Sequence, residues 1–273
     1  MPKEFLLPLP SATDEDAVVD RALAFARLHD ARLVIYVPAA IPTPTASPWG
    51  LSADTLIAEL YGTIEREAHA RADVLRQRLR DVDVAWDVRV GRACFADPAL
   101  TFAHEARCAD LAVVGQPGGE DASIWHAYFS AALSGSGRPV LVLPRRGFEA
   151  ARVQRLLVGW KSTRESARAV HDALAQFAPT HVEIVVVGEG GDEEDPGVAI
   201  ASHLAHHGVA VTTTATPAAG KSVATTLLLH AAATGADLLV AGGYGHTRLR
   251  EWVLGGATRD LLEQTEFPVL FSH

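Results

Sequence analysis

The stretch Ala109-Asp110-Leu111-Ala112-Val113-Val114-Gly115 decides the fold, because it recurs as Ala236-Asp237-Leu238-Leu239-Val240-Ala241-Gly242. In both copies an Asp precedes a short apolar run that ends at a Gly, a pattern typical of a parallel strand buried on both faces. The apolar run at residues 139–143 recurs in the same way at residues 268–271, at nearly the same distance from its Gly. The sequence therefore predicts two copies of one α/β unit, each ending in strand, loop and helix, then strand.

The remaining elements also correspond between the two halves. Short apolar runs and helical patterns alternate in both, which is typical of βαβ units with parallel strands and right-handed crossovers. The predicted strands are residues 4–10, 32–37 and 84–90 in the first half, and 153–160, 182–187 and 209–214 in the second. The predicted helices include residues 14–28, 53–79, 123–133, 163–177, 222–233 and 256–264. We expect an α/β protein of two tandem doubly wound domains, residues 1–147 and 152–273, that meet in the polar stretch 145–149.

Composition narrows the classes of function. The 273 residues include 24 Lys and Arg against 33 Asp and Glu, a formal net charge of −9. A surface this acidic repels phosphate backbones and anionic lipid, so we expect neither nucleic acid nor membrane as a partner. No apolar run approaches the roughly 20 residues that span a bilayer, and residues 1–12 fit a first strand better than a signal peptide. Cys94 and Cys108 suit reduced, buried thiols, and we expect a cytoplasmic protein.

A glycine-rich segment follows the fourth predicted strand of the second half. It places glycines at 242, 243, 245, 255 and 256, and a predicted helix starts near Gly256. In doubly wound sheets ligands bind at the carboxyl ends of the strands. Glycines there let backbone N–H groups approach an anion, and the helix N-terminus adds positive potential. The segment predicts a phosphate site; the alternative is that its glycines serve only tight turns and close helix–sheet contacts.

On these residues the sequence resembles the universal stress protein family, over essentially the whole chain and as a tandem pair of its domains. The nucleotide-binding members carry Gly, two residues, Gly, nine residues, Gly and then Ser or Thr, and Gly242, Gly245 and Gly255 fit that spacing. The resemblance implies five-stranded parallel sheets of order 3-2-1-4-5, with the two last strands antiparallel to one another. It also implies a ligand-dependent regulator in the stress response. We further expect a homodimer and, because the sequence places no general base or nucleophile, weak ATPase activity at most.

The resemblance further implies ATP or a related adenine nucleotide in the second domain, with Mg²⁺ as a companion ion. In the family the loop and the helix start hold the phosphates, and an Asp at the end of the first strand contacts adenine. Two positions depart from this pattern: Gly256 lacks the hydroxyl but keeps its N–H, and Lys161 stands where the acid is expected and could neutralise a phosphate. The expected nucleotide-binding residues are Trp160, Lys161, Val187, Gly242, Gly245, His246, Gly255, Gly256, Ala257 and Thr258.

The corresponding segment of the first half is a poorer phosphate site. After Gly115 it reads Gln116-Pro117-Gly118-Gly119-Glu120-Asp121, with two acids where phosphate would lie. The later Gly135 and Gly137 follow a predicted helix, whose C-terminal carbonyls favour a glycine cap and disfavour an anion. We expect this domain to have a degenerate loop and a structural or regulatory role.

A second phosphate motif competes with the glycine segment. Residues 215–222, Ala-Thr-Pro-Ala-Ala-Gly-Lys-Ser, follow a predicted strand and open a helix as a Walker A loop would. Ala215 replaces the first required glycine, and Pro217 removes a backbone donor. We expect a strand-to-helix turn with Ser222 near the helix cap. A P-loop NTPase that uses Lys221 is one alternative function, and a structural dimerisation module without nucleotide is another.

Three further patterns are assigned to solvated surface. His203, His206 and His207 lie on one predicted helix, but no Glu follows the first His and no third ligand for zinc is evident. The proline-rich residues 38–48 predict an extended, exposed loop. The acidic residues within 188–197 lack the ligand spacing of a calcium loop.

Overall fold

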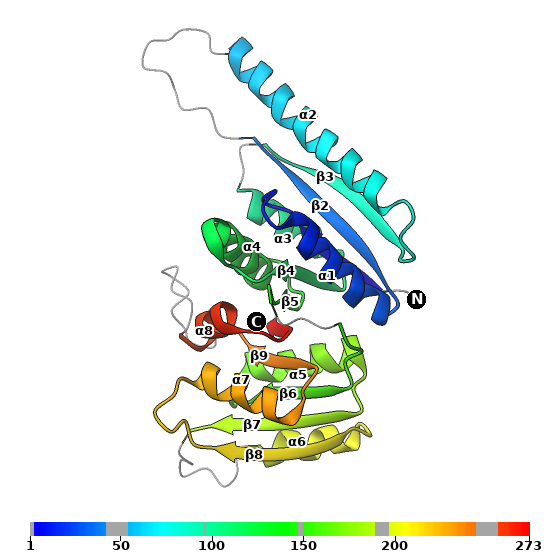
Figure 1. Ribbon diagram of the computed structural model, residues 1–273. Helices are drawn as coiled ribbons and strands as arrows, with labels where there is room; N and C mark the ends of the chain where they lie inside the picture. The colour runs from blue at the N-terminus through cyan, green and yellow to red at the C-terminus, as the bar shows by residue number, and fades with distance from the viewer. Residues whose placement is uncertain (1–2, 42–53, 95–96, 147–149, 189–196, 244–255) are drawn as a thin grey trace.

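The computed structural model describes residues 3–41, 54–94, 97–146, 150–188, 197–243 and 256–273. Strands and helices alternate through both halves, as the sequence predicts (Figure 1). The strands are β1 (Lys3–Pro8), β2 (Ala31–Ile41), β3 (Trp86–Cys94), β4 (Leu111–Gly115), β5 (Val140–Leu143), β6 (Arg155–Gly159), β7 (His181–Val187), β8 (Ala210–Thr216), β9 (Leu238–Gly242) and β10 (Val269–Ser272). The helices are α1 (Glu15–Leu28), α2 (Asp54–Leu79), α3 (Pro98–Ala106), α4 (Ala122–Gly135), α5 (Arg164–Phe177), α6 (Val198–His206), α7 (Val223–Thr234) and α8 (Gly256–Gln264).

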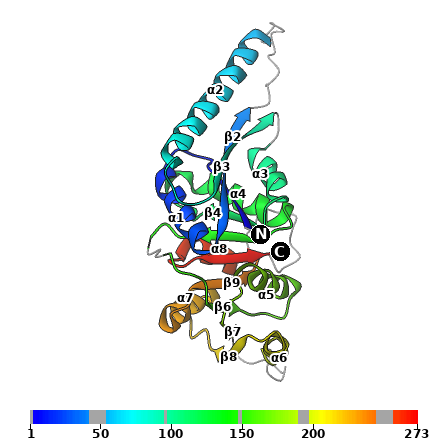
Figure 2. The ribbon, with the colours of Figure 1, turned by 90° about the vertical axis from the view of Figure 1, so that its right-hand side faces the viewer.

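All ten strands belong to one sheet, in the order β3-β2-β1-β4-β5-β10-β9-β6-β7-β8. Each half is therefore a parallel five-stranded sheet of order 3-2-1-4-5, which confirms the predicted fold class. Helices cover both faces of the sheet: α1, α2 and α7 lie on one side, and α3, α5 and α6 on the other (Figure 2).

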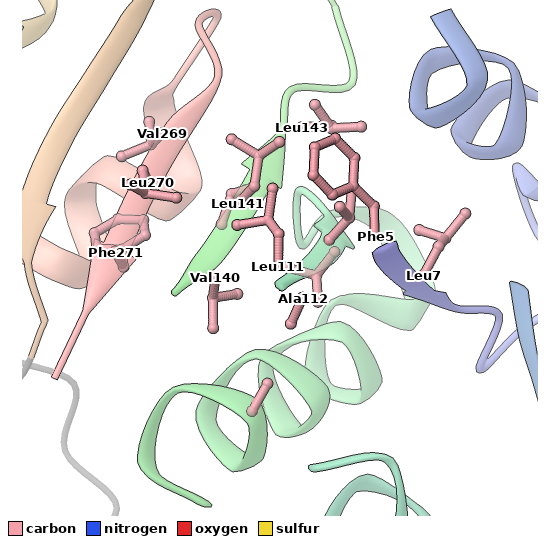
Figure 3. Close-up of a cluster of buried hydrophobic side chains, with 14 of the residues drawn as sticks. Phe5, Leu7, Leu111, Ala112, Val140, Leu141, Leu143, Val269, Leu270 and Phe271 are labelled. Atoms are coloured by element: carbon pink, nitrogen blue, oxygen red, sulfur yellow. The ribbon is translucent and has the colours of Figure 1, made fainter. Parts of the chain in front are cut away.

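The two halves join through their last strands. β5 and β10 pair antiparallel, with Leu141 opposite Leu270, as the resemblance implies. Leu141, Leu270 and the neighbouring Phe271 are fully buried, and Figure 3 shows these side chains gathered where the two sheets meet. The Phe271 ring packs edge-on against Phe129 of α4, with 5.2 Å between ring centroids. The cores of the two halves are thus continuous, and each strand covers an edge that its partner would leave exposed.

The repeated Asp has the same structural role in both halves. Asp110 Oδ2 accepts the N–H of Glu4 at 2.8 Å, next to the start of β1. Asp237 Oδ2 accepts the N–H groups of Gln154 and Arg155, both at 2.9 Å, at the start of β6. In each half this carboxylate ties the first strand to the fourth, the pair between which the strand order reverses.

β2 and β3 are longer than the sequence predicts. The predicted exposed loop at residues 38–48 is wrong for residues 38–41, which continue β2 and pair with β3 through Ile41 and Cys94; residues 42–48 lie outside the described residues. Pro38 is tolerated because β1 ends opposite Tyr36, so beyond that point β2 has a neighbour on one side only. Residues 91–94 extend β3 past its predicted end, and Figure 1 shows α2 running along this extension.

Cys108 corrects another expectation. It lies in the turn between α3 and β4 and is exposed, not buried, because the helix ends at Ala106 before the chain re-enters the sheet. The side chain of Cys94 lies outside the described residues. Among the described helices, none is long and apolar enough to cross a membrane.

Candidate functional site

The strand order of the second half reverses between β6 and β9. The two strands are parallel neighbours, and their register places Gly159 beside Ala241, so their carboxyl ends lie at one edge of the sheet. α5 starts a few residues after β6, and α8 is the helix that follows β9. Ligands of doubly wound sheets bind at this kind of switch point.

Three of the sequence-predicted site residues lie at this edge, directly after or at the end of their strands. Trp160 follows β6, and its backbone N–H donates to Val185 O at 2.8 Å, which keeps it in register with β7. Lys161 comes next and is exposed. Val187 ends β7 and is half-buried. The edge therefore presents a cation beside partly apolar side chains.

The start of α5 supplies a carboxylate that the sequence did not identify. Thr163 caps the helix by accepting the N–H of Ser166 at 3.3 Å, and Glu165 lies buried in the first turn. Burial alone would raise the pKa of Glu165, but an ion pair with Arg164 and hydrogen bonds from the backbone and Thr163 outweigh it, so the pKa is lowered. The only available signal was an acid in the first turn of the predicted helix, which is common at helix N-termini.

Close packing accounts for Gly242. A Cβ at this position would lie 2.6 Å from the backbone N of Ser166 and 2.8 Å from the backbone C of Glu165. A Cβ on Gly243 would lie 2.6 Å from a methyl carbon of Leu133 in the first half. The predicted alternative, glycines for close helix–sheet contact, thus applies to Gly242 whether or not a ligand binds.

The start of α8 is exposed. Gly256 is its first residue, and a Cβ there would meet no atom of the described part of the chain within 4 Å. Ala257 is exposed as well, whereas Thr258 is buried with 6% of its surface exposed. The first four N–H groups of a helix have no partner within the helix, so this end offers backbone donors to an anion. The predicted site residues Gly245, His246 and Gly255 lie outside the described residues.

The equivalent edge of the first half is filled by its own side chains. A cavity of about 20 Å³ remains there, far below the roughly 300 Å³ of a small-molecule site. A Cβ on Gly115 would lie 3.3 Å from the Trp125 ring, and one on Gly118 would lie 2.7 Å from an Arg145 nitrogen. Asp121 accepts the Ser11 hydroxyl at 2.6 Å; this bond and one from Thr13 lower its pKa.

A wider groove of about 640 Å³ opens beside this cavity, between the two halves. Arg21, Arg145 and Arg146 line it on the first half, and residues 263–266 line it on the second. Burial lowers the pKa of Arg21, although Asp14 opposes the shift. Gln116 spans the groove, since its Nε2 donates to Glu263 O at 3.2 Å. The walls carry charges of both signs.

The Walker-like segment forms the turn that its sequence predicts. Ser222 caps α7 by accepting the N–H of Thr225 at 3.1 Å. Lys221 therefore follows β8, the edge strand, two strands away from β6 in the sheet. Adjacent strands lie about 4.8 Å apart, so β8, the strand that Lys221 follows, lies about 10 Å from β6.

The histidines of α6 have a neighbour that the sequence did not reveal. His171 of α5 lies with its Nε2 at 3.2 Å from Nε2 of His203. The contact joins residues 32 positions apart, which no local spacing could indicate.

Comparison with known proteins agrees with the fold. Residues 152–273 match the sequence profile of the Universal stress protein family. No curated protein matches the sequence of this chain. A universal stress protein from Archaeoglobus fulgidus DSM 4304 has a similar structure, with a TM-score of 0.67, 15% identity and coverage of 99% of this chain and 96% of that one. A candidate universal stress protein from Pseudomonas aeruginosa UCBPP-PA14 is also similar, with a TM-score of 0.56, 15% identity and coverage of 99% and 93%.

At this identity the structural matches establish the fold, and the profile match establishes the family for the second half. Both similar structures are covered almost end to end, so the tandem arrangement extends over the whole chain. Residues 152–273 belong to the universal stress protein family, and residues 3–146 repeat the fold of that domain.

Proposed function

We propose that the chain binds one adenine nucleotide, ATP or a relative, in its second domain at the carboxyl ends of β6 and β9. The observation that carries the proposal is the exposed start of α8, the helix that follows a strand at the switch point; among the described residues, a Cβ on Gly256 would meet no atom within 4 Å. The family match of residues 152–273 supports the same location. At the equivalent edge of the first half, Trp125 and Arg145 line a cavity of about 20 Å³, beside the wider groove between the halves.

The residues at this edge fit the chemistry of a nucleotide. Backbone N–H groups at the start of α8 donate to phosphate oxygens, and the exposed Lys161 adds a positive charge. Trp160 and Val187 offer partly apolar surface for the base. Mg²⁺ would be held mainly by the phosphates and water, as is usual for this ion.

A regulatory role follows from where α8 ends. Its first residue lies at the proposed site, and its last turn contacts the first half through Gln116 and Glu263. A ligand bound at the start of α8 therefore contacts a helix whose last turn is hydrogen-bonded to the first half. We propose that nucleotide occupancy changes this contact and so the choice of partner in a stress response.

Calorimetric titration of ATP, ADP and AMP into the full chain tests the site. Lys161→Ala should weaken ATP binding by ~1–2 kcal/mol, about five- to thirtyfold in Kd, because one charge-assisted contact is lost. Lys221→Ala is the matched control and should leave Kd unchanged. Loss of binding at Lys221 with Lys161→Ala still binding would instead favour the P-loop NTPase.

Gly256→Ser gives a test in the opposite direction. It introduces the hydroxyl that this position has in the nucleotide-binding members, and a Cβ there meets none of the described atoms within 4 Å. We expect tighter ATP binding by roughly threefold to tenfold, the scale of one added hydrogen bond. Weaker binding in a folded Gly256→Ser protein would contradict a phosphate at the start of α8.

The groove between the halves is the rival position for a nucleotide, because its volume is sufficient and three Arg line it. Arg145→Ala distinguishes the two. Binding that depends on Arg145 and not on Lys161 places the nucleotide in the groove. A parent protein that binds no nucleotide and co-purifies with none leaves the structural dimerisation module as the function.

A further inference from the structure

α5 and α6 cover one face of the second half (Figure 2), and three histidines belong to these helices or directly follow them. His171 lies on α5, His203 on α6, and His207 directly after α6. The His171 and His203 Nε2 atoms are 3.2 Å apart, and the ring centroids of His203 and His207 are 4.8 Å apart. All three side chains are exposed. The cluster lies outside the proposed nucleotide site and does not depend on it.

The tautomer of His171 suits a metal ligand. Its Nδ1 lies 2.8 Å from the backbone carbonyl of Ala167, where the nitrogen donates its proton. In neutral His171 the lone pair is then on Nε2, the atom that faces His203. Metal-binding histidines are commonly oriented by this kind of second hydrogen bond.

The spacing of the two Nε2 atoms also suits a shared ion. Zn²⁺ binds imidazole nitrogen at about 2.0–2.1 Å with tetrahedral geometry, which sets two ligand nitrogens about 3.3–3.4 Å apart. The observed 3.2 Å is close to that value and at the long end of the range for a hydrogen bond. Arg168, one turn before His171, is held by Asp172 and by the carbonyl of Gly137.

A third donor requires a side-chain movement. Among the described residues, no three His, Cys, Asp or Glu side chains already converge on a metal position. His207 is four residues after His203, the spacing that places two His on one helix face, and its exposed side chain is able to rotate. His206 differs, because its Nδ1 lies 2.6 Å from the carbonyl of Ser202 in its own helix. We propose that His171, His203 and His207 bind a divalent transition-metal ion of the Zn²⁺ class.

Calorimetric titration of Zn²⁺ into the untagged full chain at pH 7.5 tests this proposal. We expect one high-affinity ion per chain, with affinity reduced at least about tenfold in His171→Ala and in His203→Ala, as for the loss of a ligand or its support. His207→Ala should weaken binding as well. His206→Ala is the matched control on the same helix and should bind as the parent does.

Electron paramagnetic resonance of bound Cu²⁺ reports the nitrogen atoms that coordinate the ion. It therefore distinguishes the loss of one ligand from a change in folding. Hyperfine coupling from several imidazole nitrogens should appear in the parent and lose at least one nitrogen in His171→Ala. Absence of a stoichiometric Zn²⁺ site, or equal losses in His206→Ala and His203→Ala, would overturn the proposal. All substituted side chains are exposed, so circular dichroism should show each variant folded as the parent is.

Discussion

At the scale of single residues, His29 of the first half contacts two residues of the second half as well as its own helix. Its ring stacks on Phe25, with 4.3 Å between centroids, and meets the edge of Phe177 of α5 at 5.1 Å. Its Nδ1 lies 2.9 Å from Phe25 O, and its Nε2 accepts the N–H of Val153 at 3.2 Å. One neutral imidazole thus donates to α1 and accepts from the segment that leads into β6.

Stability should therefore fall as the pH decreases through the ordinary range of histidine. Burial is the main cause that lowers the pKa of His29; Arg152 and Lys3 lower it further, while the bond to Phe25 O and the charge of Asp30 oppose the shift. Since the folded state binds the proton less readily than the unfolded state, stability is present above a pH of about 6.5 and lost below it.

The measurement is urea unfolding from pH 7.5 to 5.5 for the parent and His29→Phe. The variant should lose ~1 kcal/mol at pH 7.5, because the Val153 N–H loses its acceptor, and should show a shallower decrease with pH than the parent. An identical pH dependence in both proteins would rule out His29 as the group that titrates.

At the scale of elements, the contact between β9 and α5 fixes the geometry of the proposed nucleotide site. The backbone of the first turn of α5 lies against Gly242, so this strand end and this helix start are held at a separation that admits no side chain. A ligand at the switch point would therefore bind beside a closely packed contact between the end of β9 and the start of α5.

Gly242→Ala should therefore destabilise the protein by ~1–3 kcal/mol, the usual cost of overpacking, even without ligand. Gly256→Ala is the comparison, since its Cβ meets nothing within 4 Å in the part of the chain that the structure describes, and its effect should stay within about 0.5 kcal/mol. The change in unfolding free energy of each variant is measured from the shift of its urea midpoint, at an unchanged m-value. A harmless Gly242→Ala would show that α5 shifts away from β9 easily.

The elements also show which features the sequence could predict. The repeated run after Asp110 and Asp237 was sufficient to predict two copies of one α/β unit, because a buried strand imposes its pattern on consecutive residues. The strand order within each sheet came only from the family resemblance, since strand neighbours leave no local pattern. Residues 38–41 were misassigned, since Pro38 usually marks a loop and its tolerance depends on where β1 ends. The position of Glu165 against Gly242, and of His171 beside His203, depends on packing between distant elements and leaves no local pattern.

At the scale of the whole molecule, the pairing of β5 with β10 leaves β3 and β8 as the two edges of one sheet. β3 carries Asp87, Arg89 and Arg92, and charged side chains discourage further pairing. β8 has the sequence Ala-Val-Thr-Thr-Thr-Ala-Thr, with no charge and no proline. If whole chains form the expected homodimer, β8 is the edge best suited to pair with its copy.

Light scattering at micromolar concentration should accordingly give a mass near twice the 29.0 kDa of one chain. Ala215→Lys, at an exposed position of β8, should shift this mass toward the monomer because a charged side chain on an edge strand discourages pairing with another strand. Val74→Lys on α2, also exposed, is the control and should not shift the mass. A monomeric parent would contradict the homodimer, and a dimeric Ala215→Lys would place its interface elsewhere.

The antiparallel junction of β5 and β10 has a consequence for how this protein evolves. In a dimer of identical single-domain chains, every mutation appears twice, on both sides of the symmetry axis, so the two pockets change together. Here the same kind of junction lies within one chain, and a mutation appears once. The two halves accordingly differ at equivalent edges: Trp125 and Arg145 line the small cavity of the first half, whereas the exposed Gly256 starts α8 at that edge in the second.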